Sequence, residues 1–138
     1  MISLVSRRAA LLALVIVAAG CDRKPRCSRC GMVIDERSRF LAQIGGPSGV
    51  RSFDTPKCAL TVWLTEGRRG ALHLIEHYSG KPVVATEIVF AEGSDVLGPM
   101  GHDLIPVARE HAARFQRDHA AKRLLELGEL TKELVEGL

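Results

Sequence analysis

The amino-acid sequence predicts an α+β fold in which two small, similar units pack together. Short segments with alternating apolar residues indicate strands, and two longer stretches have apolar side chains at helical spacing. The segment that follows the first helical stretch resembles the one that follows the second, which indicates an internal repeat. The length of 138 residues fits one domain or two very small ones.

The first half of the chain is predicted to follow the order β-β-α-β. Its strands are expected at residues 40–44, 50–53 and 71–78. The glycine- and proline-rich sequence between the first two strands is typical of a hairpin turn. The helix is expected to begin at Pro56 and to end near Glu66, because Thr55 is a good N-cap and proline is favoured at the first helical position.

The second half is predicted to contain the same kinds of element. They are expected at residues 83–91 (strand), 106–120 (helix), 122–127 (strand) and 130–135 (a final helical turn). A loop rich in glycine and proline, residues 93–101, separates the first strand from the helix. We therefore predict a first unit of residues 27–80 and a second unit of residues 81–138.

The first twenty residues have the composition of a bacterial export signal. Arg7 and Arg8 precede an apolar run of twelve residues, which is too short to cross a bilayer of about 30 Å as a helix. The sequence Val-Ala-Ala-Gly before Cys21 resembles a lipobox, in which the cysteine is acylated and becomes the mature N-terminus. Residues 1–20 are therefore predicted to be a lipoprotein signal peptide, and residues 21–26 a short tether.

The arginine pair also has the form of a twin-arginine export signal, so general secretion and twin-arginine export are both open. We expect the mature protein on the periplasmic side of the inner membrane, with the outer membrane as the alternative. Removal of the signal peptide would lower the net charge from +3 to +1. This balance argues against nucleic-acid binding, which requires a concentrated basic surface.

Three cysteines remain after Cys21, namely Cys27, Cys30 and Cys58. Three thiols cannot all pair within one chain, and free thiols outside the cytoplasm tend to oxidise, so their presence suggests a use for thiolates. Cys27 and Cys30 are three residues apart and can place both sulfurs on one ion. Met32 adds a thioether, and thiolates with a thioether favour Cu(I). A Cys27–Cys30 disulfide is the alternative.

Two further segments carry candidate ligands. Cys58 would lie in the first turn of the predicted helix, where the helix dipole and Lys57 would lower the pKa of its thiol. Alternatively, it is a small buried apolar residue. Met100 lies between proline and glycine, a poor position for a core residue, so a ligand role is expected, with His102 as a further candidate. A surface turn without a ligand is the alternative.

These motifs, taken together and in order, resemble the NosL family. They are Cys21 of the lipobox, Cys27-x-x-Cys30-Gly31-Met32, Phe53-Asp54-x-x-x-Cys58, Tyr78-Ser79-Gly80 and Gly98-Pro99-Met100-Gly101. Members of this family are accessory copper lipoproteins encoded with nitrous oxide reductase. The resemblance implies two ββαβ-type units, distantly similar to part of organomercurial lyase.

The resemblance also implies a ligand set and a function. Cys30, Met32 and Met100 would be the first ligands of Cu(I), with Cys27 and Cys58 binding directly or assisting. Copper would be delivered outside the cytoplasm to nitrous oxide reductase or a similar copper enzyme, together with its membrane maturation complex. We therefore expect a membrane-anchored metallochaperone and no enzymatic activity.

Three other functions are compatible with the cysteines. The main alternative is a structural or metal-sensing zinc site, in which Cys27, Cys30, Cys58 and one histidine form a tetrahedron. A thiol–disulfide oxidoreductase fits less well, because its paired cysteines open a helix and here Gly31 follows directly. An organomercurial lyase would use two thiols and a carboxylate, for which Asp54 is a candidate, but that chemistry is cytosolic.

Overall fold

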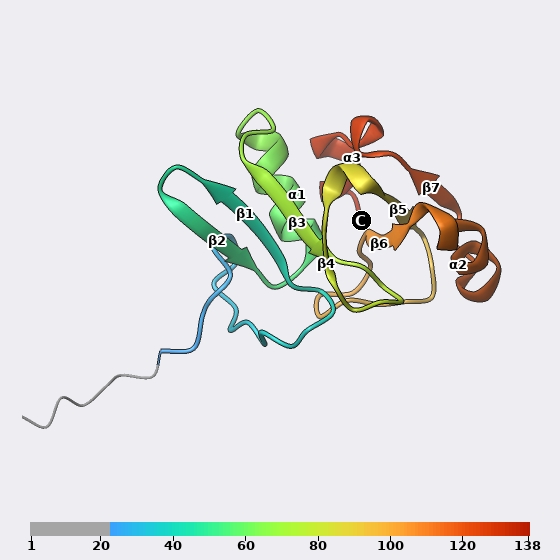
Figure 1. Cartoon of the computed structure of the whole chain (residues 1–138), viewed down its shortest axis with the longest axis horizontal. Coiled ribbons are helices and arrows are strands. Elements are labelled where there is room, and N and C mark those ends of the chain that lie inside the picture. Colours follow the sequence, from blue (N-terminus) through green and yellow to red (C-terminus); the bar gives the residue numbers. More distant parts are fainter. Residues whose placement is uncertain (1–22) are drawn as a thin grey trace, which may run out of the picture.

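The computed structural model describes residues 23–138, in which two antiparallel sheets lie side by side (Figure 1). The predicted signal peptide and Cys21 lie outside the described residues. The first sheet has the strand order β2-β1-β3-β4. Its strands are β1 (Ala42–Gly46), β2 (Gly49–Phe53), β3 (Ala71–Ile75) and β4 (Pro82–Val84).

The second sheet repeats the topology of the first. It has the order β6-β5-β7, with β5 (Ile88–Glu92), β6 (Ile105–Ala108) and β7 (Arg123–Leu125). Helix α1 (Pro56–Thr65) connects β2 to β3, and α2 (Ala112–His119) lies between β6 and β7. Each sheet therefore contains a β-β-α-β sequence whose first strand lies in the middle, and the predicted α+β fold is confirmed. A short helix, α3 (Lys132–Glu136), packs against α1.

Local sequence signals explain the elements of the first sheet. The turn between β1 and β2 ends at Gly49, whose φ of +112° is a conformation that favours glycine. Helix α1 begins as predicted, because the Thr55 side chain accepts a hydrogen bond from the Cys58 N–H (3.1 Å) and Pro56 occupies the first position. Its last residue, Thr65, is followed by Gly67 with a φ of +75°.

The predicted strand over residues 83–91 is wrong, because this segment belongs to both sheets. Its first part is β4, which pairs with β3, and its second part is β5, which pairs with β6 and β7. A 3₁₀ turn at Ala85–Glu87 joins the two strands. The apolar run continues through the turn because Ala85 is itself buried, so the sequence shows no break there.

The predicted helix start at Pro106 is also wrong. Pro106 lies in β6 and pairs with Phe90 of β5. Because β6 is an edge strand, the missing N–H of proline is tolerated there. The Pro106 carbonyl accepts a hydrogen bond from the His77 N–H (2.9 Å), which attaches the second sheet to the end of β3. The helix itself begins at Ala112, after a 3₁₀ turn at Arg109–His111.

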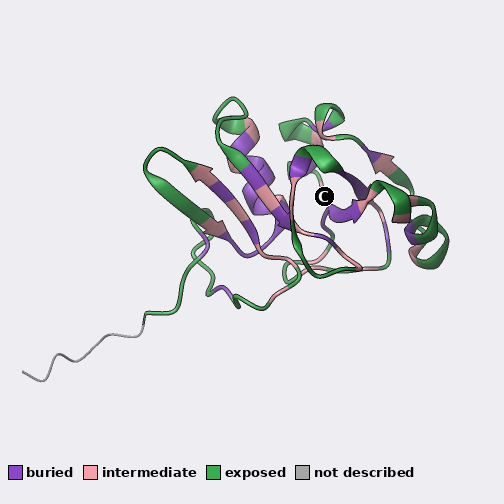
Figure 2. Ribbon diagram, viewed as in Figure 1, coloured by how far each residue is buried: buried purple, intermediate pink, exposed green. Residues whose placement is uncertain are grey.

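The two sheets share a core. Side chains of β5 alternate between its faces, with Ile88 and Phe90 packed in the main cluster with α1 and the first sheet, and Val89 and Ala91 packed with Phe115 of α2. The second sheet is therefore covered on both faces. Figure 2 shows buried residues concentrated in α1 and in several strands, whereas most of β2 is exposed.

A buried carboxylate also connects the two units. Glu76 follows β3 and is 2% exposed, and its carboxylate accepts hydrogen bonds from the N–H groups of Ser79 (2.6 Å) and Ala108 (3.1 Å). Burial alone raises the pKa of this carboxyl, but the backbone donors outweigh burial and lower it below its ordinary value.

Within residues 23–138, no helix is both long and apolar enough to span a membrane.

Candidate metal centre

Three cysteines and one aspartate meet at one end of the first unit. Cys27, Cys30, Asp54 and Cys58 each offer one ligand atom, and these atoms all lie within 4.8 Å of one another. All three cysteines are free thiols; Cys27 and Cys58 are buried and Cys30 is exposed. The four residues come from two segments, the loop at residues 27–32 and the junction between β2 and α1. We call these four side chains the thiol cluster.

Backbone hydrogen bonds shape the loop that carries the first two thiols. The Cys27 N–H donates to the Met32 carbonyl (2.8 Å), and the Gly31 N–H donates to the Cys27 carbonyl (3.0 Å). Gly31 has a φ of +77°, so a glycine suits the point where the loop turns back. The Ser28 N–H donates to the Ser52 carbonyl of β2 (3.0 Å), which fixes the loop beside the start of α1.

The junction between β2 and α1 supplies Asp54 and Cys58. Asp54 is 6% exposed, and its Oδ1 lies 3.4 Å from the Cys30 Sγ, which can donate its S–H. Its Oδ2 is buried and has no hydrogen-bond partner among the described residues. An unpaired buried carboxylate oxygen is costly, and a cation between the thiols would satisfy it. The geometry therefore fits a metal ion.

Burial controls the ionisation of Cys58. Its side chain is fully buried, and burial raises the pKa of the thiol from 9.0 to about 12, although Thr55 and the guanidinium of Arg29 (3.9 Å from the sulfur) act in the opposite direction. The predicted lowering of this pKa is therefore wrong. The cost of burying a thiolate exceeds the benefit of the helix start, and the Lys57 amine binds the carbonyl of Leu138 instead (2.8 Å).

Cys30 also has a raised pKa. Its causes are burial and hydrogen bonds to Cys27 and Asp54, while the backbone N–H of Met32 acts to lower it. Without metal, Cys30 and Cys58 are therefore protonated at neutral pH. A metal ion has to displace these protons as it binds, as is usual for thiolate sites.

The structure leaves the ligand roles of the two methionines as predictions. Met32 is 44% exposed and Met100 is 49% exposed. Met100 lies in a tight turn closed by hydrogen bonds between the backbones of Gly98 and Gly101 (2.8 and 3.1 Å). The same loop reaches the start of α1, because the Lys57 N–H donates to the carboxylate of Asp103 (2.8 Å). Met100 is therefore three residues away from a contact with the first unit.

Two residues differ from the predicted ligand set. His102 is exposed and is not one of the four grouped residues. Asp54, in contrast, belongs to the cluster but is absent from the predicted ligands. The spacing of Phe53-Asp54-x-x-x-Cys58 is the signal that could have found it, because a residue just before a helix lies beside the first turn of that helix.

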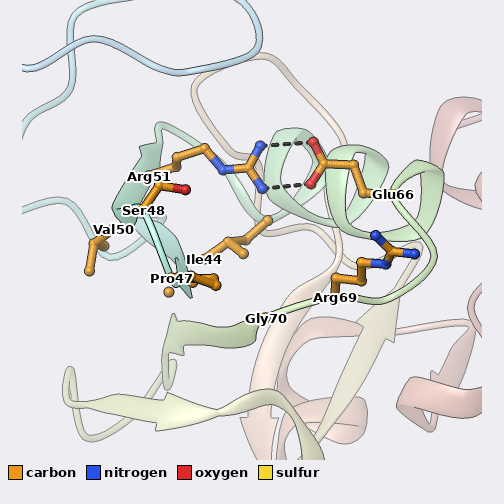
Figure 3. Close-up of a pocket in the computed structure, with 11 residues that line it drawn as sticks. Ile44, Pro47, Ser48, Val50, Arg51, Glu66, Arg69 and Gly70 are labelled. Carbon is orange, nitrogen blue, oxygen red and sulfur yellow. Dashed lines mark hydrogen bonds and ion pairs between the residues drawn. The ribbon is translucent and has the colours of Figure 1, made fainter.

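A separate pocket lies between the β1–β2 hairpin and the end of α1 (Figure 3). Figure 3 shows the guanidinium of Arg51 facing the carboxylate of Glu66, with two hydrogen bonds of 2.8 and 2.6 Å. Its lining contains no thiol and no imidazole. Since the charge of Arg51 is already paired, we regard this pocket as part of the hairpin's attachment to α1.

The fold and the thiol cluster define a metal-binding protein built from two ββαβ units. The family model of NosL matches residues 19–135, so the chain belongs to the NosL family, as the sequence motifs predicted. Among solved structures, the crystal structure of the copper chaperone NosL from Shewanella denitrificans matches with a TM-score of 0.65 and 18% sequence identity. The match covers 78% of this chain and 90% of that chain and concerns the fold. No curated protein sequence matches the chain.

Proposed function

We propose that this protein is a lipid-anchored copper chaperone, which binds Cu(I) in the thiol cluster and passes it to a copper-receiving protein outside the cytoplasm. The observation that carries this proposal is the meeting of three free thiols and a buried carboxylate within 4.8 Å. Membership of the NosL family supports copper as the metal. The chaperone role agrees with the structural neighbour from Shewanella denitrificans, which is a copper chaperone.

The donor set favours a soft metal ion. Three thiolates are soft ligands, and thioethers such as those of Met32 and Met100 bind Cu(I) but are unusual zinc ligands. Both methionines are exposed. Met32 ends the loop that carries Cys27 and Cys30, and Met100 lies in the loop whose Asp103 binds the start of α1. We propose that one or both complete the copper coordination.

The exposure of the thiols suggests how the copper leaves. Cys30 is exposed, whereas Cys27 and Cys58 are buried. An incoming thiolate, thioether or imidazole of the acceptor therefore meets the Cys30 side of the ion first. Each copper–sulfur bond that breaks is replaced by a bond to the acceptor, so the ion moves by ligand exchange without a change of oxidation state.

We further propose that Cys21 is acylated and holds the protein on the periplasmic side of the inner membrane. The lipobox and the apolar segment before it support this assignment. The acceptor that we propose is nitrous oxide reductase with its membrane maturation complex, on the basis of the family. A similar extracytoplasmic copper enzyme is the alternative acceptor.

The test is an anaerobic titration of the reduced mature chain with Cu(I) in the presence of a competing Cu(I) chelator. We expect one tightly bound ion, and at least about 100-fold weaker binding in Cys30→Ala, because even residues behind metal ligands contribute 10- to 100-fold. Met32→Leu should also weaken binding. Ser28→Ala, an exposed change in the same loop, is the matched control and should leave the affinity unchanged.

Zinc is the second candidate, and one observation favours it. The fourth member of the thiol cluster is a carboxylate, Asp54, which suits zinc better than Cu(I). The site would then have three cysteines and an aspartate, not the histidine expected from the sequence. Native mass spectrometry with both metals separates the two functions. A preference for zinc, with no effect of Met32→Leu on metal binding, would contradict the copper proposal.

A further inference from the structure

The peptide between the proposed lipid anchor and the folded domain is very short. The Pro25 carbonyl accepts a hydrogen bond from the Ile34 N–H (2.8 Å), and Arg26 pairs with Val33 in an antiparallel bridge. The chain is therefore fixed to the domain from Pro25 onwards. Four residue steps separate Cys21 from Pro25, and a fully extended chain covers at most about 14 Å over four steps.

The thiol cluster begins two residues later. A fully extended chain from Cys21 to Cys27 would cover at most about 22 Å over its six residue steps. If Cys21 is acylated, as proposed above, it lies in the headgroup region of the membrane. The cluster is then held within this distance of the bilayer surface, whatever the orientation of the rest of the domain.

Basic side chains crowd the same end of the domain. The exposed residues Arg23, Lys24, Arg26 and Arg29 fall within seven positions, and no acidic residue occurs between residues 23 and 34. Val33, which is 47% exposed, lines a shallow groove with the first three of them. We call these five residues the basic surface. Since the net charge after removal of the signal peptide would be only +1, this positive charge is local.

The basic surface lies at one end of the molecule. In Figure 1 the blue segment meets the domain beside the end of β2, whereas α2 lies at the opposite end, beyond the second sheet. In the sequence, acidic residues flank the basic surface on both sides, with Asp22 before Arg23 and with Asp35 and Glu36 before Arg37. An anionic surface approached from the N-terminal side would therefore meet mainly positive charge.

We propose that the basic surface rests on the anionic phospholipid headgroups of the membrane that holds the anchor, so that the end of the domain with the thiol cluster lies close to the bilayer and α2 points away from it. This proposal rests on the acylation of Cys21. Each basic side chain near an anionic membrane strengthens such a contact about fivefold, and the anchor makes the contact intramolecular. The exposed Cys30 is then presented to an acceptor whose metal site lies close to the membrane surface.

The experiment uses the full-length acylated protein in vesicles that contain brominated lipids, which quench tryptophan fluorescence at short range. One variant carries Val33→Trp in the basic surface, and its matched control carries Val50→Trp in the β1–β2 hairpin, where the valine is even more exposed (64% against 47%). Both retain the buried Trp63 as a common background. Vesicles of phosphatidylcholine alone are compared with vesicles that also contain phosphatidylglycerol.

We expect phosphatidylglycerol to increase the quenching of Val33→Trp but not that of Val50→Trp. Salt at about 1 M, where the Debye length is about 3 Å, should abolish the increase. The double change Arg23→Glu and Lys24→Glu should also abolish it, whereas Arg114→Glu and Arg117→Glu in α2 should not.

Equal quenching at both positions, or quenching that does not depend on phosphatidylglycerol, would overturn the proposed orientation while leaving copper binding and acylation intact. Intact-mass measurement and flotation of the same samples report on acylation separately. A chain that carries no lipid and does not float would overturn both the anchor and the orientation.

Discussion

The two units differ most at the junction between their second strand and their helix. In the first unit, the chain passes from β2 directly into α1, and this junction supplies Asp54 and Cys58 to the thiol cluster. In the second unit, a 3₁₀ turn at Arg109–His111 intervenes between β6 and α2, and the His111 side chain makes no capping hydrogen bond. The same topology therefore places a helix start beside a strand end in both units, but among the described residues only the first junction holds a group of metal-binding side chains.

Aromatic and histidine side chains pack where the end of the first unit, at His77 and Tyr78, meets α2 of the second unit. The rings of His77 and Tyr78 meet edge to face with centroids 4.9 Å apart, and the ring centroids of Phe115 and His119 are 4.6 Å apart. Burial, together with the nearby His119 and Arg39, lowers the pKa of His77, so this imidazole is neutral at pH 7. The imidazoles of His77 and His119, a type of side chain that often binds metals, therefore pack against aromatic rings in this protein.

The metal-binding chemistry depends on additions to the shared frame. The loop at residues 27–32 precedes the first sheet and supplies two of the thiols. The second sheet has no comparable loop before it, because only the 3₁₀ turn at Ala85–Glu87 separates β4 from β5. The long loop between β5 and β6, which contains Met100, contacts the first unit through Asp103. Each unit therefore depends on the other, and substitutions at their contacts should reveal that dependence.

The largest effect is expected at Glu76, which connects the units. Glu76→Ala removes two hydrogen bonds to a charged acceptor, from the N–H groups of Ser79 and Ala108, and we expect the free energy of unfolding to fall by about 3–5 kcal/mol. Because the folded pKa of Glu76 is lowered, its contribution is present above the ordinary value of 4.5 and is lost as the pH falls through the folded pKa. Denaturant unfolding at pH 7 measures the effect.

The control for this change is Glu66→Ala. Glu66 pairs with Arg51 at the surface, where both side chains are 43% exposed, so the loss should be at most about 1 kcal/mol. If both variants lost the same stability, Glu76 would not be the connection between the units that its contacts indicate.

The next effect concerns Asp103, through which the second unit holds the start of α1. Burial raises the pKa of Asp103 from 3.8 to about 7, although the N–H groups of Leu104 and Lys57 act against it. Between these pH values the folded protein keeps a proton that the unfolded chain has lost. The stability should therefore fall as the pH rises, by up to about 1.4 kcal/mol per pH unit, and level off above about pH 7.

Asp103→Asn removes this titration and should flatten the pH dependence of the free energy of unfolding between pH 4 and 7. Asp118→Asn is the control, because Asp118 is exposed and forms only an i,i+4 pair with Arg114. An unchanged slope in Asp103→Asn would show that another group causes it.

A third prediction separates the two candidate metals at the thiol cluster. Asp54→Asn removes the charged oxygen donor but keeps a side chain of the same shape. We expect zinc affinity to fall about 10- to 100-fold and Cu(I) affinity to change by less than about threefold, because carboxylates bind zinc well and Cu(I) poorly. Competition titrations with each metal measure both values. An equal loss of affinity for the two metals would contradict this prediction and would show that Asp54 supports the binding of both.

The smallest effect concerns the start of α1, which has a side-chain cap that α2 lacks. Thr55→Ala should lower the free energy of unfolding by about 1–2 kcal/mol, since the Cys58 N–H loses its acceptor. Thr131→Ala, at the exposed start of α3, removes the same kind of bond to the Leu134 N–H and should cost less, about 0.5–1 kcal/mol. Thermal unfolding of both variants, with the Cu(I) affinity as a second readout, tests the difference.

Local signals in the sequence determined the hairpin and helix α1 of the first unit. The glycines of the hairpin, the Thr55-Pro56 helix start and the glycine after α1 act on their own neighbours, so the structure agrees with the predicted positions of these elements. The ordered motifs also determined the family, because they cover most of the chain. The sequence also indicated that the three thiols have a common use, because Cys27 and Cys30 are spaced for one ion and an odd number of cysteines cannot all form disulfides.

Tertiary structure alone decided the remaining features. The apolar run at residues 83–91 crosses from one sheet to the other, and Pro106 lies in an edge strand, because both depend on strand partners far away in the sequence. The same holds at the site, where the burial of Cys58 raises its pKa and the packing of the 27–32 loop on β2 brings Asp54 to the thiols. Burial and pairing are properties of the whole fold, whereas caps and turns are properties of a few adjacent residues.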